Sequence, residues 1–230
     1  MKLSSKALAC GQSPMRKFHP YAVAAAAAGK KIYHLNIGQP DIHTPDALYD
    51  AIHNFRTPVL AYAASPGIPE LIEAIRKYYE NIGVGLDESD ILITTGGSEA
   101  LQIAANCLLD DGDEVIVPGY TFIASIATIA MMNAIPVLAE IDESLTIDPM
   151  KIEALITPKT KAIMPVHMLG NPCDMDPIME IAKKHNLYVI EDCCQAVGAA
   201  YHGKRVGTIG DMGAYSLNVF KTITLSLIHI

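Results

Sequence analysis

The stretch that decides the fold is residues 161–196, KAIMPVHMLGNPCDMDPIMEIAKKHNLYVIEDCCQA. It holds two short apolar runs, at 161–166 and 187–192, and an amphipathic segment at 176–185 lies between them. The apolar residues of that segment recur at helical spacing, which predicts a helix with one apolar face. A strand, a helix and a second strand in this order are typical of a βαβ unit, whose two strands run parallel in one sheet.

The same alternation continues on both sides of this unit. Helical periodicity begins near residue 68, and a nearly all-apolar helix, predicted to be buried, covers 122–132. Further apolar runs predict strands at 90–95, 114–118, 135–141 and 213–217. Continuously apolar strands separated by helices indicate a parallel sheet covered on both faces. The sequence therefore predicts an α/β fold, a three-layer sandwich with a mostly parallel sheet.

The bulk properties exclude several classes of function. The 230 residues carry a formal net charge of -8, from 25 acidic and 17 basic residues, without a Lys/Arg-rich patch. This composition argues against nucleic acid and anionic membrane as partners. The five cysteines lack C-x-x-C spacing, which predicts reduced thiols in a cytoplasmic protein and no zinc site.

The candidate site residues follow the predicted strands. In an open α/β sheet, ligands bind beyond the carboxyl ends of the strands. TGGSEAL (95–101) places Gly97 and Ser98 at the start of a helix, where backbone N–H groups bind anions. The alternative is an ordinary turn in which Ser98 caps the helix.

Two later strand ends carry chemistry as well. VIEDCCQA (189–196) ends a strand with Asp192, which could hold a protonated ring nitrogen or cap a following helix. SLNVFK (216–221) places Ser216 and Lys221 five residues apart. A lysine must lose its proton to form a Schiff base, and an apolar setting disfavours the charged form. The simpler alternative is a surface lysine.

The order of these features resembles pyridoxal phosphate (PLP) enzymes of the aspartate aminotransferase fold, fold type I. That order is strand–GGS, strand–aromatic, strand–Asp-x-x-Gln and strand–Ser-x4-Lys. Residues 1–117 resemble class I/II aminotransferases through LNIGQPDIHTP, AYAASPGIPELIEAI and ILITTGGSEALQIAANCLLDDGDEVIVP. Residues 118–224 resemble the DegT/StrS sugar-nucleotide aminotransferases through PGYTFIASIATIAMMNAIPVLAEID and VIEDCCQAVGAAYHGKRVGTIGDMGAYSLNVFKTIT.

The resemblance implies a role for each matched position. Lys221 matches the lysine that forms the Schiff base with PLP and then moves a proton, and Asp192 matches the carboxylate on the pyridinium nitrogen. Gln195 matches the residue that contacts the ring hydroxyl, and Phe122 matches the aromatic residue that stacks on the ring. The phosphate cradle matches Gly97, Ser98 and Ser216.

Five further positions have weaker assignments. In the class I/II half, Gly38 matches the glycine near the substrate carboxylate, and Tyr62 matches the tyrosine that reaches the phosphate of the partner subunit. We expect His167 to be a packing or hydrogen-bonding histidine. The Cys193–Cys194 pair is assigned no chemistry.

The resemblance also implies a domain organisation. Residues 1–45 correspond to an N-terminal arm or small-domain segment, 46–224 to the PLP-binding large domain, and 225–230 (LSLIHI) to a non-native tail. The two families meet near residues 117–119, which natural recombination or an assembly artefact explains. Relatives carry a further strand between the strands at 90–95 and 213–217. We therefore expect a fold that is incomplete at its C-terminus and that folds poorly or binds PLP weakly.

The function implied is PLP-dependent transamination from an amino acid such as glutamate to a keto acceptor. A nucleotide-linked keto-sugar is favoured, because the lysine-bearing half resembles the sugar enzymes. Alternatives are a class I transaminase that acts on a 2-oxo acid, an inactive chimeric fragment, and a plain binding module for a phosphorylated metabolite. Lys221 argues against a sugar dehydratase, in which histidine replaces it. Relatives are homodimers with active sites at the interface.

Overall fold

The computed structural model describes residues 3–11, 16–34, 43–59, 61–218 and 221. The chain divides into two compact units, Met1–Pro40 and Asp41–Ile230. The first unit contains α1 (Ser5–Ala9) and α2 (His19–Ala27). Within the described part of the chain, no helix combines the length and apolar character that a membrane crossing requires. The predicted boundary at residue 45 stays a prediction.

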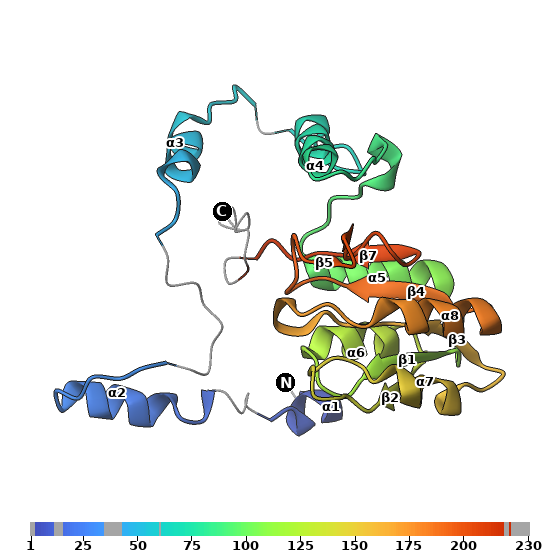
Figure 1. Cartoon of the computed structure of the whole chain (residues 1–230). Helices are drawn as coiled ribbons and strands as arrows, with labels where there is room; N and C mark the ends of the chain where they lie inside the picture. The colour runs from blue at the N-terminus through green and yellow to red at the C-terminus, as the bar shows by residue number, and fades with distance from the viewer. Residues whose placement is uncertain (1–2, 12–15, 35–42, 60, 219–220, 222–230) are drawn as a thin grey trace. The chain divides into compact units, whose positions relative to one another are not determined.

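The second unit is built on a five-stranded parallel sheet with the strand order β2-β1-β3-β4-β7 (Figure 1). The strands are β1 (Glu114–Pro118), β2 (Ile135–Ala139), β3 (Thr160–Ile163), β4 (Tyr188–Asp192) and β7 (Met212–Ala214). A separate antiparallel pair joins β5 (Ala200–Tyr201) and β6 (Lys204–Arg205). The predicted parallel sheet is therefore confirmed, with several strands shorter than their apolar runs.

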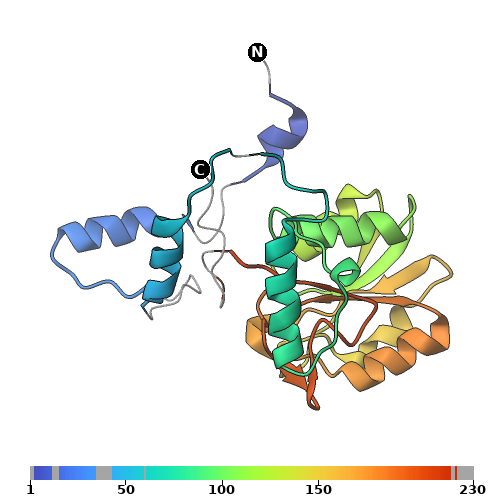
Figure 2. The same cartoon turned by 90° about the horizontal axis from the view of Figure 1, so that it is seen from above.

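Helices cover both faces of this sheet, as Figure 2 shows for α5 (green) and α8 (orange). On one face α5 (Gly97–Leu108) and α6 (Ile123–Met131) pack over a core that includes Val115, Val117 and Ile190. On the other face α7 (Pro149–Ile152) and α8 (Met175–His185) pack over Ile116 and Ile163. The alternation along β1 follows from the period of two in a strand. The predicted three-layer sandwich is confirmed.

Further helices and 3-10 turns complete the second unit. They are α3 (Asp46–Asn54), α4 (Pro69–Asn81) and the 3-10 turns Glu88–Asp90, Glu153–Leu155 and Met168–Gly170. The predicted burial of the apolar helix holds for the middle of α6 but is wrong at its ends. Ile123 and Met131 are 65% and 66% exposed, because only one face of α6 lies on the sheet.

The strand predicted at 90–95 is wrong. The segment is extended after the 3-10 turn at 88–90. The Ile93 N–H donates to the Pro66 carbonyl at 2.9 Å, and the Thr95 N–H donates to the Glu99 carboxylate. It has no ladder partner among the described residues, and β7 pairs with β4 alone. Ile91 and Ile93 are half-buried and Leu92 is exposed, so the apolar run is not enough to make a strand, which also needs a neighbouring strand.

Candidate active site

The carboxyl ends of β4 and β7 meet the start of α5. Asp192 pairs with Ala214 in register, so Ser216 lies just beyond the end of the same ladder. Gly97 packs directly against this edge: a Cβ placed there would lie 2.6 Å from Cys194 Sγ and 3.1 Å from Ser216 Cβ. Only glycine allows this close approach. The structure therefore brings together three regions of the sequence that were predicted separately.

Asp192 is 4% exposed and its carboxylate is held at both oxygens. Its Oδ2 accepts a hydrogen bond from Ser125 Oγ at 2.7 Å, and its Oδ1 accepts one from the Cys194 N–H at 3.1 Å. No helix follows Asp192 in residues 193–199, so the helix-capping alternative is wrong. The aspartate is a fixed, buried acid at the end of a strand, as a partner for a cationic ring nitrogen must be.

Sequence reasoning did not identify Ser125. It lies in α6, is fully buried, and also contacts Thr121 Oγ1 at 2.8 Å. A hydroxyl has one proton, and the carboxylate at 2.7 Å is the strongest acceptor in reach, so Thr121 donates to Ser125 and Ser125 donates to Asp192. The available signal was a hydroxyl in an otherwise apolar helix.

The start of α5 has the backbone arrangement in which a helix N-terminus can bind an anion. Gly96 is the N-cap with φ of 120°, and no side chain caps the helix, so the alternative role of Ser98 as a cap is wrong. The Ser98 side chain is exposed. The N–H groups of Gly97 and Ser98 have no acceptor among the described residues, as expected in a first helical turn. They are the groups that bind a phosphate at a helix N-terminus.

Lys221 is half-buried, and its backbone N–H donates to the Asn218 carbonyl at 2.9 Å. The positive charge of its side chain lowers the pKa of the Cys194 thiol, against a larger effect of burial. Burial, followed by the Asp192 carboxylate, raises the pKa of Cys194, and the charge of Lys221 opposes this. Cys194 also contacts the start of α5. The lysine is thus within electrostatic range of the edge that holds Gly97 and Asp192.

The remaining predicted residues have fewer contacts with the site, or lie outside the described residues. Gln195 is half-buried, and its Oε1 accepts from the Leu169 N–H at 3.0 Å, which leaves its NH₂ group as a donor. Phe122 is the N-cap residue of α6 and is 57% exposed. Tyr62 is fully exposed. Gly38 and the segment 225–230 lie outside the described residues.

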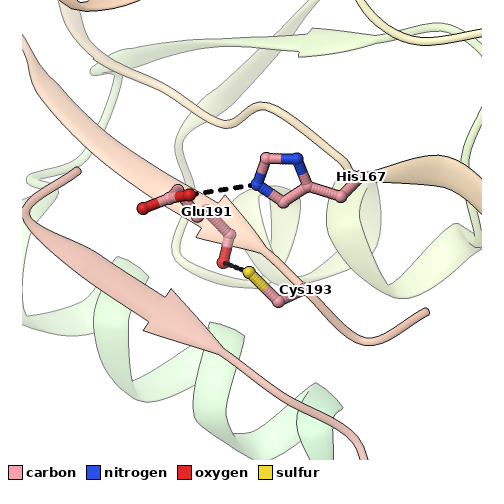
Figure 3. Close-up of side chains that lie close together, drawn as sticks. All are labelled: His167, Glu191 and Cys193. Atoms are coloured by element: carbon pink, nitrogen blue, oxygen red, sulfur yellow. Dashed lines mark hydrogen bonds and ion pairs between the residues drawn. The ribbon is translucent and has the colours of Figure 1, made fainter. Parts of the chain in front are cut away.

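His167 and Glu191 form a fully buried pair next to the site (Figure 3). His167 Nδ1 accepts from the Cys173 N–H at 3.0 Å, so Nε2 carries the proton and donates to Glu191 Oε2 at 3.0 Å. His167 is therefore the hydrogen-bonding histidine that was expected. With Cys193 the pair has the composition of a metal site. However, both ring nitrogens and both carboxylate oxygens are already engaged, so we assign no metal there.

Ser125→Ala is expected to lower the free energy of unfolding by about 1.5–3 kcal/mol, because a buried carboxylate loses a charge-assisted hydrogen bond. Urea denaturation measures this. Thr128→Val in the same helix is the matched control, because within the described residues the Thr128 hydroxyl bonds to the Ala124 carbonyl of its own helix and to no carboxylate. Equal losses in the two variants would contradict the assignment.

Acid is expected to destabilise the protein partly through Glu191. Burial raises the pKa of this carboxyl, but hydrogen bonds from His167 and from three backbone N–H groups outweigh burial and hold it below its ordinary value. A group with a lowered pKa in the folded state stabilises the protein above its unfolded pKa, and the stability is lost as pH falls through the folded pKa. Its titratable neighbours are His167, Cys173, Cys193 and Tyr215. Unfolding free energy measured against pH should lose this acidic slope in Glu191→Gln, and an unchanged slope would contradict the assignment.

The comparisons with known proteins agree with this geometry. Residues 75–226 match the model of the DegT/DnrJ/EryC1/StrS aminotransferase family. The chain is 59% identical over 141 residues to dTDP-3-amino-3,6-dideoxy-alpha-D-galactopyranose transaminase of Aneurinibacillus thermoaerophilus, covering 61% of this chain and 36% of that protein. It is 51% identical over 130 residues to GDP-perosamine synthase of Caulobacter vibrioides, covering 56% and 35%.

Solved structures show the same large domain. The aspartate aminotransferase of Rhizobium meliloti matches 89% of this chain and 54% of its own, with 29% identity and a TM-score of 0.68. A Bacillus subtilis protein solved with bound cofactor PMP matches 78% and 39%, with 30% identity and a TM-score of 0.62. The chain spans about a third of the length of the two curated relatives. The family match begins at residue 75, so this likeness is not confined to 118–224, and the splice stays a prediction.

Proposed function

This chain belongs to the DegT/DnrJ/EryC1/StrS aminotransferase family, and we propose that it transfers an amino group from an amino acid to a nucleotide-linked keto-sugar. Glutamate is the expected donor. The family is PLP-dependent. The observation that carries the proposal is the packing of Gly97 against Cys194 and Ser216, beside the buried carboxylate of Asp192. This arrangement joins an anion site to an acid at one edge of the sheet.

The residues present fit PLP group by group. The cofactor has a phosphate, a basic ring nitrogen, a ring hydroxyl and an aldehyde. The N–H groups of Gly97 and Ser98, with the Ser216 hydroxyl, suit the phosphate. The Asp192 carboxylate suits the ring nitrogen. Gln195 suits the ring hydroxyl, and the Lys221 amine suits the aldehyde. A side chain at position 97 would fill the space where α5 meets the two strand ends. The close approach that glycine permits is what a backbone phosphate cradle requires.

Each residue then has a defined task. When bound, PLP draws electrons from the substrate carbon through its protonated ring. Asp192 holds the proton on the ring nitrogen, while Ser125 keeps the carboxylate oriented. Lys221 would hold the cofactor covalently and would move the proton at the substrate carbon. Phe122 would cover one face of the ring and exclude water from it.

The finer assignments belong to the same proposal. Gly38 contacts the substrate carboxylate, and Tyr62 reaches the phosphate of a partner subunit, so the protein acts as a homodimer. Residues 46–224 form the PLP-binding domain. The cysteines among the described residues are all free, which supports a cytoplasmic location.

A second candidate is a class I transaminase that acts on a 2-oxo acid. It is favoured by the aspartate aminotransferase of Rhizobium meliloti, which matches more of this chain than either curated sugar transaminase does. The sugar acceptor remains preferred, because the two relatives at 51% and 59% identity are named for sugar products.

The test supplies purified protein with saturating PLP, glutamate and one acceptor at a time. The acceptors are a GDP-linked keto-sugar, a dTDP-linked keto-sugar and oxaloacetate, and the product is 2-oxoglutarate. We expect product with a nucleotide-linked keto-sugar. Product with oxaloacetate alone would support the class I function. Absence of PLP binding and of product with every acceptor would overturn both and support the inactive fragment.

A further inference from the structure

Glu191 is buried on the opposite side of β4 from Asp192, because neighbouring side chains of a strand alternate. Its carboxylate is fully buried and accepts four hydrogen bonds. The donors are His167 Nε2 at 3.0 Å and the N–H groups of Gly207 at 2.7 Å, Ile209 at 2.8 Å and Gly210 at 2.7 Å. A buried charge with this many donors is fully satisfied, and removing it leaves several buried groups unpaired.

The 207–210 turn is shaped around this carboxylate. Converging backbone N–H groups form a concavity that elsewhere binds external anions, and here the anion belongs to the chain itself. Gly207 has φ of +85°, and a Cβ there would lie 2.0 Å from Tyr215 Oη. The turn therefore contacts the residue that follows β7 directly.

The same turn leads into β7, which carries the site residues. Asp211 donates its N–H to the Val189 carbonyl at 2.9 Å and accepts from the Val189 N–H at 2.8 Å. Glu191 pairs with Gly213, and the next pair is Asp192 with Ala214. β7 has only three residues and, among the described residues, only one neighbouring strand. A strand of three residues that includes a glycine has few contacts to fix its register against β4.

We propose that Glu191 is a positioning residue: its carboxylate ties the 207–210 turn to β4 and so sets the register that places Ser216 beside Asp192. Its effect on cofactor binding rests on the proposed function, whereas its effect on β7 does not. His167 completes the arrangement by donating to the same carboxylate from the segment after β3. His167 and Glu191 thus connect the segment after β3, the end of β4 and the turn before β7. Their effect on PLP binding is indirect, through the positions of these three segments.

Glu191→Gln tests this proposal, because the amide keeps the shape but loses the charge and presents an NH₂ group to N–H donors. We expect hydrogen exchange at the amides of Gly207, Ile209 and Gly210 to become at least about tenfold faster. The amide NMR signals of Ala214 and Ser216 should shift, and PLP affinity should fall. The matched control is Glu180→Gln, an exposed glutamate on α8.

A lowered melting temperature with unmoved signals for Ala214 and Ser216 would overturn the proposal, since Glu191 would then be merely structural. If Glu191→Gln does not fold, Glu191→Asp provides the second measurement, because it keeps the charge on a shorter side chain. We expect it to shift the same signals by less, and unshifted signals overturn the proposal. The NMR result holds whether or not PLP binds, so failure of this inference is distinguishable from failure of the proposed function.

Discussion

Lys221→Ala is expected to abolish covalent attachment of PLP and to slow amino transfer by at least ~10²–10⁴-fold, the usual contribution of a positioned general base. The reason is that the variant loses both the amine that carries the cofactor and the base that moves the proton. Attachment is measured at saturating PLP, so that a difference in PLP affinity does not limit the result. Borohydride reduction followed by peptide mass analysis locates the adduct.

Two controls separate chemistry from charge. Lys221→Arg keeps the positive charge near Cys194 but offers no amine for attachment, so it should fail as Lys221→Ala does. Lys204→Ala removes an exposed lysine of β6 and should leave the adduct unchanged. An adduct that survives in Lys221→Ala at the wild-type level would mean that Lys221 is a surface lysine.

Much of the fold was predictable because its signals are local. The apolar runs at 114–118 and 187–192 became β1 and β4, since each run is bounded by polar or turn residues that end a strand. The βαβ alternation then left few arrangements open. The run at 90–95 failed for a non-local reason. Its residues suit a strand, but pairing depends on a neighbour that the run itself does not contain.

The candidate site likewise contains residues that the sequence indicates and residues that only the structure reveals. Asp192 and Lys221 could be proposed from the sequence because they follow predicted strands in a recognisable order. Ser125 was missed, because its partner Asp192 is 67 residues away and the helix around it is apolar. The role of Glu191 was missed because its donors are backbone N–H groups, which every residue type except proline supplies. Sequence order identifies reacting groups more readily than the groups that hold them.

Gly213→Ala is expected to lower the free energy of unfolding by more than ~3 kcal/mol, the upper end of ordinary overpacking. A Cβ at this position would lie 2.3 Å from the Gly207 carbonyl oxygen and 2.6 Å from the Gly207 Cα. Both are backbone atoms, so no side-chain rotation relieves the clash, and β7 has to move away from the 207–210 turn. Urea denaturation measures the loss.

The matched control is Gly85→Ala, because a Cβ at Gly85 meets nothing within 4 Å and its backbone needs no glycine. The consequence for the site follows from the register of β7. Gly213 pairs with Glu191, so displacing it also displaces Ala214 and the Ser216 hydroxyl that follows. Gly213→Ala should therefore weaken PLP binding at temperatures where the variant is still folded. A folded variant with wild-type PLP affinity would show that the phosphate cradle does not depend on the register of β7.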